Sequence, residues 1–232
     1  MIMKVFLSKK PDSLYQFIFI HGWGGNEKSL YNLASLFFNK YSCHLLCLSG
    51  FGDQIIDKPY TVSDYVDEIE KYIEDNNLKN VVIIGHSFGG KIAFFLKLRH
   101  QEYQIITLAP SIRKNPFSLW VNIKIILYKI FKKLHLPIFS FLLGSRDYQN
   151  SSSFLRKTFL NVHHYYLNNE QLKQIKSSLI IGFKQDKEVN YKVLKKVAND
   201  KIKFILKDGD HFAYQESLLE IYHIIMCYIK GQ

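Results

Sequence analysis

The segment Gly85–Gly89 reads Gly-His-Ser-Phe-Gly and places one serine, Ser87, between two glycines. It follows the apolar run 81–84 and precedes a stretch with helical periodicity. A serine hydroxyl attacks a carbonyl carbon when it projects toward a base. A tight strand-to-helix turn projects it in this way if the flanking residues have almost no side chain. The glycines around the serine meet this demand, so the segment predicts a nucleophilic Ser87.

Two further polar residues follow predicted strands later in the chain. Asp186 comes shortly after the apolar run 179–182, and His211 comes shortly after the run 204–206. The nucleophile, acid and histidine thus each follow a strand, in the order Ser, Asp, His. In this hypothesis His211 takes the proton of Ser87 and later returns it to the leaving group, while Asp186 holds the imidazole in the required tautomer.

A glycine-rich loop follows the apolar run 17–20 near the start of the chain. The segment His21–Gly25 reads His-Gly-Trp-Gly-Gly, which leaves backbone N–H groups free. We expect the backbone N–H groups of Trp23 and Phe88 to form an oxyanion hole for the tetrahedral intermediate, and His21 to brace the loop. This chemistry requires neither a cofactor nor a metal.

Other residues are alternatives for the base and the acid. His86 lies beside the serine, but neighbouring residues on a sharp turn project in different directions, which favours His211 as the base. Asp208 and Asp210 lie too close in sequence to His211 to orient it easily. Glu188 is the alternative acid.

These three motifs together resemble the α/β-hydrolase superfamily, from about residue 14 to the C-terminus except in the middle of the chain. The resemblance implies an α/β fold with a mostly parallel central sheet, helices on both faces and an inserted helical lid. It divides the chain into a core of residues 1–111 and 166–232 and a lid of residues 112–165. A serine at position 87, where some members carry an aspartate, favours acyl transfer to water.

The sequence departs from the superfamily pattern in two places. Three residues separate Gly182 from Asp186, whereas the superfamily often has two. The turn 49–54 carries Ser49 in place of the usual proline and Gln54 in place of the usual serine. The second difference affects a structural turn rather than the chemistry.

Short runs rich in β-branched and aromatic residues alternate with segments of helical period along the chain. Several runs are apolar throughout, which is typical of strands in a sheet covered on both faces. The expected strands are residues 3–8, 15–20, 43–49, 80–85, 103–108, 178–183 and 202–207. A capping box, Thr61 with Asp64, predicts the start of a helix with an apolar face.

Composition indicates one folded domain with an insertion. The chain has 232 residues, of which 47% are hydrophobic, and this excludes a disordered chain. No N-terminal segment has the pattern of a secretory signal, and no run of about eighteen uncharged apolar residues occurs, so we expect a soluble, cytoplasmic protein. The three cysteines lack the spacing of zinc ligands, and we expect reduced thiols. They are Cys43, Cys47 and Cys227.

Basic residues concentrate in the predicted lid, 112–165. This segment holds nine basic residues and one acidic residue, a large part of the net charge of +11. On a helical projection, Lys129, Lys132 and Lys133 lie away from an apolar stripe. The stripe comprises Trp120, Ile123, Leu127, Ile130, Phe131 and Leu134.

The lid and the loop suggest a substrate class. An apolar stripe suits the nonpolar acyl portion of an ester or thioester, and the basic residues suit an acidic carrier protein or an anionic membrane surface. The loop His21–Gly24 also resembles that of pimeloyl-[acyl-carrier-protein] methyl ester esterases. We therefore expect a serine esterase that acts through an acyl-enzyme intermediate and does not bind nucleic acid. A lipid ester hydrolase at a membrane and a ligand-binding protein without turnover are the alternatives.

Overall fold

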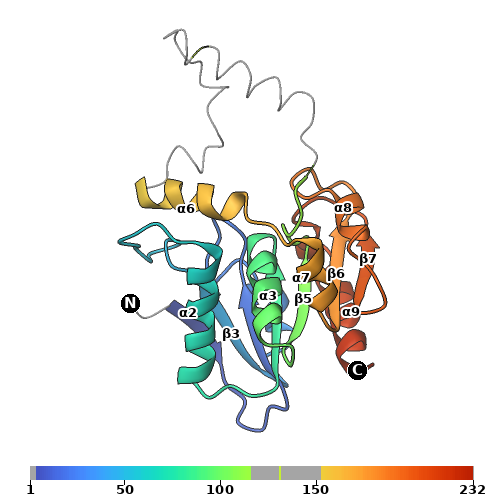
Figure 1. Cartoon of the computed structure of the whole chain (residues 1–232). Coiled ribbons are helices and arrows are strands. Elements are labelled where there is room, and N and C mark those ends of the chain that lie inside the picture. The colour runs from blue at the N-terminus through green and yellow to red at the C-terminus, as the bar shows by residue number, and fades with distance from the viewer. Residues whose placement is uncertain (1–3, 116–130, 132–152, 232) are drawn as a thin grey trace.

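The computed structural model describes residues 4–115, 131 and 153–231, and these form a single seven-stranded sheet (Figure 1). The strand order is β1-β3-β2-β4-β5-β6-β7. The strands are β1 (Lys4–Ser8), β2 (Gln16–Ile20), β3 (Ser42–Cys47), β4 (Val81–His86), β5 (Gln104–Leu108), β6 (Ser178–Phe183) and β7 (Ile202–Lys207). Only the β1–β3 pair among them is antiparallel. The seven predicted strands and the mostly parallel sheet are confirmed.

Helices cover both faces of this sheet because, after β3, the chain changes the direction in which it adds strands to the sheet. The chain moves outward from β2 to β3, then back past β2 to β4 and onward to β7. Right-handed crossovers therefore place the helix after β2 on one face and those after β3, β4 and β6 on the other. These crossover helices are α1 (Tyr31–Ser35), α2 (Val62–Asp75), α3 (Phe88–Arg99) and α8 (Tyr191–Lys195). The last helix, α9 (Leu218–Lys230), contacts α1.

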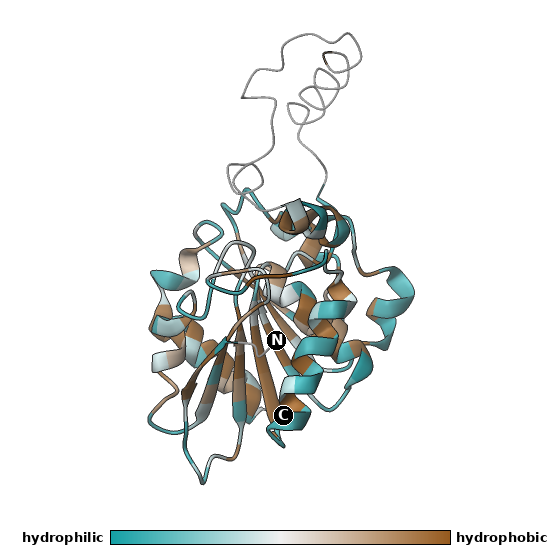
Figure 2. Ribbon diagram, turned by 90° about the vertical axis from the view of Figure 1, so that its left-hand side faces the viewer, coloured by the Kyte–Doolittle hydropathy of each residue, from teal (hydrophilic) through white to brown (hydrophobic). Residues whose placement is uncertain are grey.

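The core lies between these layers. Residues of β3, β4 and β6 are buried along their whole length, as expected of parallel strands covered on both faces. Figure 2 shows the strands as a hydrophobic band through the molecule, with hydrophilic residues along the outer sides of the helices. The predicted capping box is present at the start of α2. The Thr61 hydroxyl accepts the Asp64 N–H (3.2 Å), and the Asp64 carboxylate accepts the Thr61 N–H (2.7 Å).

The predicted lid lies only partly within the described residues. Its apolar stripe, apart from Phe131, and the basic residues Lys129, Lys132 and Lys133 lie outside them. The described part contains α6 (Ser153–His163), followed by α7 (Asn169–Gln174). Helix α6 lies across the ends of α2 and α3 (Figure 1). No helix in the described ranges is long and apolar enough to span a membrane.

The start of α3 passes so close to the sheet that only glycine fits there. A side chain at Gly89 would place its Cβ 2.2 Å from the backbone oxygen of Ile20 in β2. At Gly85 the Cβ would lie 2.5 Å from the oxygen of Gly89. Backbone atoms cannot move aside as a flexible side chain can, so these contacts fix the first turn of α3 against β2 and β4.

We predict that Gly89→Ala lowers the free energy of unfolding by about 3 kcal/mol or more, because the methyl group must displace backbone in a packed core. Urea unfolding followed by circular dichroism measures this change. Gly231→Ala is the control, since this residue follows α9 with a φ of −88° and its Cβ would come no closer than 3.2 Å to another atom, the Cys227 oxygen; it should lower stability by less than about 1 kcal/mol. Equal effects of the two substitutions would contradict the close-packing argument.

Candidate active site

Ser87 occupies a strained turn between β4 and α3. Its φ of 50° and ψ of −108° lie in a region that residues with a side chain rarely adopt. The backbone around it is held on both sides. The Ser87 N–H donates to the oxygen of Leu108 (2.9 Å), and the Ser87 oxygen accepts the N–H groups of Lys91 (3.0 Å) and Ser111 (3.1 Å). The half-buried Ser87 is therefore presented at the carboxyl end of β4 by a turn that cannot relax.

His211 and Asp186 form a direct pair beside the ends of β6 and β7. His211 Nδ1 lies 2.7 Å from Asp186 Oδ2, and the Asp186 side chain is fully buried. The other carboxylate oxygen, Oδ1, accepts the N–H groups of Glu188 and Val189, each at 2.8 Å. Because a carboxylate accepts hydrogen bonds, Nδ1 carries the imidazole proton and Nε2 is left as an acceptor.

The other acids considered from the sequence have different partners. Asp210 accepts the N–H of Phe212 (2.8 Å), and Asp208 lies 3.9 Å from the ammonium group of Lys184. Glu188 is exposed at the surface. Asp186 is thus the acid that meets His211. The additional residue before it is accommodated by irregular pairing beyond β6, where the N–H groups of residues 184 and 185 donate to the oxygens of residues 207 and 209.

His86 supports the loop that carries His211. Its Nε2–H donates to the backbone oxygen of His211 (2.9 Å), and the centroids of the two rings lie 4.6 Å apart. Burial, followed by the influence of His211, lowers the pKa of His86 to about 3, so its imidazole stays neutral. This bracing role could not be read from the sequence, in which His86 stood out only as a neighbour of Ser87.

The glycine-rich loop lies directly against Ser87. A Cβ at Gly22 would lie 3.3 Å from the Ser87 Cβ and 3.0 Å from His86 Nδ1. His21 fixes this loop, as expected: its Nδ1–H donates to the Gly22 oxygen (2.7 Å), and its Nε2 accepts the Leu48 N–H (3.1 Å). Acceptance at Nε2 requires a neutral ring, and burial lowers the pKa of His21 to about 4.

Trp23 and Phe88 contact each other beside Ser87. Phe88 is the first residue of α3, and the first N–H groups of a helix have no acceptor within it. The Trp23 ring contacts the Phe88 ring, with centroids 5.6 Å apart, and the Phe51 ring at 4.9 Å. The structure thus brings the two expected oxyanion residues together. No hydrogen bond joins the Ser87 hydroxyl to His211 among those of the described residues.

Helix α6 covers this aromatic group. The Phe159 ring lies 5.1 Å from the Trp23 ring. The buried hydroxyl of Thr158 accepts the N–H of Tyr60 (2.8 Å), and the Asn161 side chain donates to the oxygen of Tyr60 (3.1 Å). These contacts place an apolar aromatic wall beside the nucleophile.

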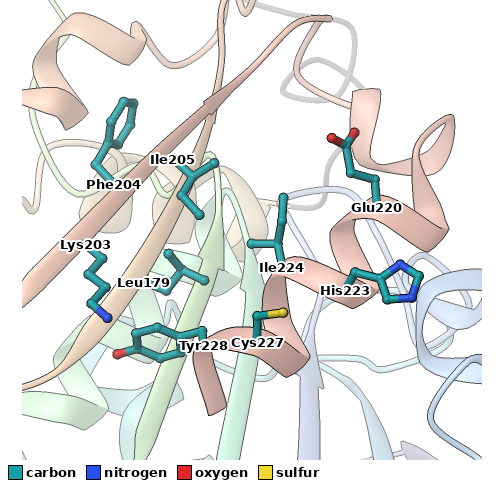
Figure 3. A pocket seen from close by; sticks show the side chains of 9 residues that line it. All are labelled: Leu179, Lys203, Phe204, Ile205, Glu220, His223, Ile224, Cys227 and Tyr228. Atoms are coloured by element: carbon teal, nitrogen blue, oxygen red, sulfur yellow. The ribbon is translucent and has the colours of Figure 1, made fainter. Parts of the chain in front are cut away.

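A concave surface lies away from Ser87, between β7 and α9 (Figure 3). The apolar residues Ile205 and Ile224 line its interior, and Lys203 and Glu220 contribute charged side chains. It opens near the beginnings of β6 and β7, whereas Asp186 and His211 follow the ends of these strands. Within the described residues no group of three or more His, Cys, Asp or Glu side chains is arranged to hold a metal ion.

Comparison with known proteins identifies the fold. Residues 15–124 match a family profile described as the alpha/beta hydrolase fold. The esterase of Exiguobacterium antarcticum superposes with a TM-score of 0.74 at 16% sequence identity, covering 98% of this chain and 96% of that one. The protein has the α/β-hydrolase fold. The expected resemblance to this superfamily is confirmed.

This α/β-hydrolase-fold protein also has curated esterase relatives. It is 30% identical over 181 residues to the pimeloyl-[acyl-carrier protein] methyl ester esterase of Wigglesworthia glossinidia brevipalpis, an alignment that covers 76% of this chain and 62% of the relative. The enzyme of the same name from Photorhabdus laumondii is 30% identical over 109 residues, an alignment that covers 46% of this chain and 40% of the relative. The chain therefore spans less than two thirds of the length of these relatives.

The buried neutral histidines predict acid sensitivity of the fold. Burial lowers the pKa values of His21 and His44 to about 4 and that of His86 to about 3, below the usual 6.5. The unfolded chain therefore binds protons below pH 6.5 that the folded chain does not, so stability falls as pH falls. We expect each histidine to remove about 2 kcal/mol between pH 7 and pH 5, measured by urea unfolding.

Two variants test whether these histidines cause the loss of stability between pH 7 and pH 5. His44→Gln should reduce the loss of stability from these three histidines by about a third, because one of the three imidazoles with a lowered pKa is gone. His223→Gln should leave it unchanged, because His223 is exposed. If His44→Gln leaves the pH dependence of the free energy of unfolding unchanged, the loss of stability does not come from these buried histidines.

Proposed function

We propose that this protein is a serine hydrolase that cleaves a carboxylic ester or thioester with a nonpolar acyl portion, through an acyl-enzyme intermediate. The observation that carries the proposal is the strained Ser87 turn beside a buried His211–Asp186 pair. His86 connects the two, since it precedes Ser87 in the chain and binds the backbone of His211. The curated esterase relatives support the same class of reaction.

The roles follow from the geometry. His211 Nε2 accepts the proton of the Ser87 hydroxyl as the serine oxygen bonds to the carbonyl carbon of the substrate. The protonated imidazole, held by Asp186, then gives this proton to the leaving alcohol or thiol. Water attacks the acyl-enzyme by the same route and frees Ser87. Catalytic hydrogen bonds of this kind often form only when substrate is bound.

The oxyanion of each tetrahedral intermediate binds between the N–H groups of Trp23 and Phe88. Loss of one such donor typically costs about 3 kcal/mol of transition-state stabilisation. His21 keeps the loop in place through its two hydrogen bonds. The rings of Trp23, Phe88 and Phe159 form the wall beside which the nonpolar acyl portion would lie.

We further propose that the acyl group arrives on an acidic carrier protein in the cytoplasm, and that residues 112–165 form a lid over the site. Two relatives named as pimeloyl-[acyl-carrier protein] methyl ester esterases support a carrier-linked substrate. Helix α6, within this segment, covers the aromatic wall and carries the exposed basic residues Arg156 and Lys157.

We predict that Ser87→Ala and His211→Ala each lower kcat/KM on p-nitrophenyl butyrate by about 10⁴-fold, and that the double variant is no worse than either. Nucleophile and base act as one unit, so their losses do not add. Ser111→Ala is the matched control: it removes a nearby hydroxyl but keeps the backbone bond to Ser87. Near-normal turnover by a folded Ser87→Ala protein would overturn the mechanism.

Carrier recognition gives a separate prediction. Changing Arg156 and Lys157 to Gln should lower kcat/KM on a methyl-pimeloyl carrier protein about tenfold at low salt, while p-nitrophenyl butyrate turnover stays unchanged, because only the carrier is acidic. Lys79 and Lys201, changed together to Gln, are the control. They remove the same charge just before β4 and β7, at the amino ends of these strands, whereas Ser87 and His211 follow their carboxyl ends.

Equal losses for the two double variants would contradict a carrier site at α6. A loss on the neutral ester as well would indicate damage to the site rather than to recognition. If instead Arg156 and Lys157 affected activity on anionic lipid vesicles alone, the membrane alternative would replace the carrier.

A further inference from the structure

Lys91 is a buried lysine on α3, one helical turn after Ser87. Its side chain is shielded by α6 and the segment that follows, and only 2% of the residue is exposed. The ammonium group donates a hydrogen bond to the backbone oxygen of Val162 (2.7 Å). It also lies 4.7 Å from the centre of the Tyr166 ring, within the range of a cation–π contact.

These partners suit a positive charge. Val162 is in the last turn of α6, where unpaired carbonyl groups give the helix its partial negative charge. The ring face of Tyr166 adds a second attraction. Even so, burial lowers the pKa of Lys91 to about 7, which shows that the site is costly for an ammonium ion. A methionine would fill the space without this cost, so packing alone does not account for lysine here.

The bond to Val162 links the nucleophile helix to the cover of the site. Phe159 precedes Val162 by three residues, so the two lie within one turn of α6. Phe159 contacts Trp23, whose loop lies against Ser87. The path from Lys91 through α6 to Trp23 therefore consists of one hydrogen bond, one helical turn and one ring contact. It ends at the loop that provides an oxyanion donor in the proposed function.

We propose that Lys91 is a positioning residue that holds the end of α6, so that Phe159 presses on Trp23 and keeps the glycine-rich loop in place beside Ser87. The positioning role itself involves only α6 and Trp23 and does not depend on the proposed function. Its consequence for turnover rests on the proposed function: without Lys91 the oxyanion donor of Trp23 is less well ordered, so kcat falls while KM changes little.

Lys97 offers a matched control on the same helix. It is also 2% exposed, and its ammonium group donates to two backbone oxygens, those of Gln101 and Tyr103, both at 2.6 Å. Burial lowers its pKa to about 8. These partners lie at the far end of α3 and not on α6, so Lys97→Met repeats the chemical change without touching the cover of the site.

The test measures the protection of Trp23 directly. The chain has two tryptophans, and Trp120→Phe leaves Trp23 as the only one, so that selectively excited tryptophan fluorescence reports on Trp23. In this background Lys91→Met should raise the acrylamide quenching constant about twofold and lower kcat on p-nitrophenyl butyrate about tenfold, whereas Lys97→Met should change neither. Phe159→Ala should raise quenching equally, and adding Lys91→Met to it should have no further effect, because both act through one contact.

The outcomes separate this inference from the proposed function. Unchanged quenching in a folded Lys91→Met protein, or equal changes for the two lysines, would overturn the positioning role even if the protein is an esterase. A Lys91-specific rise in quenching in a protein without esterase activity would support the positioning role and refute the function.

If Lys91→Met does not fold, a pH titration of the Lys97→Met protein provides the test. Quenching of Trp23 should rise between pH 6.5 and 8.5 as Lys91 loses its proton and its bond to Val162 weakens. The titratable groups facing Lys91 are His163 and Tyr166. Burial lowers the pKa of the first and raises that of the second, so both keep their protonation state in this range. Constant quenching across the range would contradict the proposal.

Discussion

The close approach of the α3 backbone to β2 and β4 is the constraint on which the rest of the structure depends. With no room for a Cβ at Gly85 or Gly89, the chain must turn sharply at Ser87, whose φ is 50°. The strain persists because the hydrogen bonds of Ser87 to Leu108, Lys91 and Ser111 hold the turn from both sides. The reactive position of the hydroxyl is thus set by backbone packing before any other side chain contributes.

Three histidines around this turn have different roles because their surroundings differ. His21 and His86 are buried, neutral and bound to backbone groups, so they act as rigid supports for the glycine-rich loop and for the loop of His211. His211 alone among the three faces a carboxylate, that of Asp186, which fixes its tautomer. A neutral His86 beside His211 also avoids placing a second cation next to the imidazolium that would form in the proposed mechanism.

Much of this arrangement could be predicted from the sequence, because it depends on local patterns. Seven apolar runs give the strands, and the glycines around Ser87 give the turn. Contacts between distant residues that belong to none of these patterns or motifs could not be predicted. Lys91 reads as an ordinary polar residue of α3, yet it is buried against Val162 of α6. Likewise Ser49, which departs from the superfamily's proline, donates to the half-buried carboxylate of Glu68 (2.5 Å), a partner on α2 that no spacing rule indicates.

Covalent acylation of Ser87 is the step on which the proposed hydrolysis depends. The most direct measurement is peptide mass mapping after reaction with a fluorophosphonate, which bonds to an activated serine oxygen and releases fluoride. We expect one adduct, on the peptide containing Ser87, that forms at least about 100-fold more slowly in His211→Ala because the hydroxyl then lacks its base. Absence of an adduct from the folded protein, or an adduct on another residue with Ser87 unmodified, would contradict it.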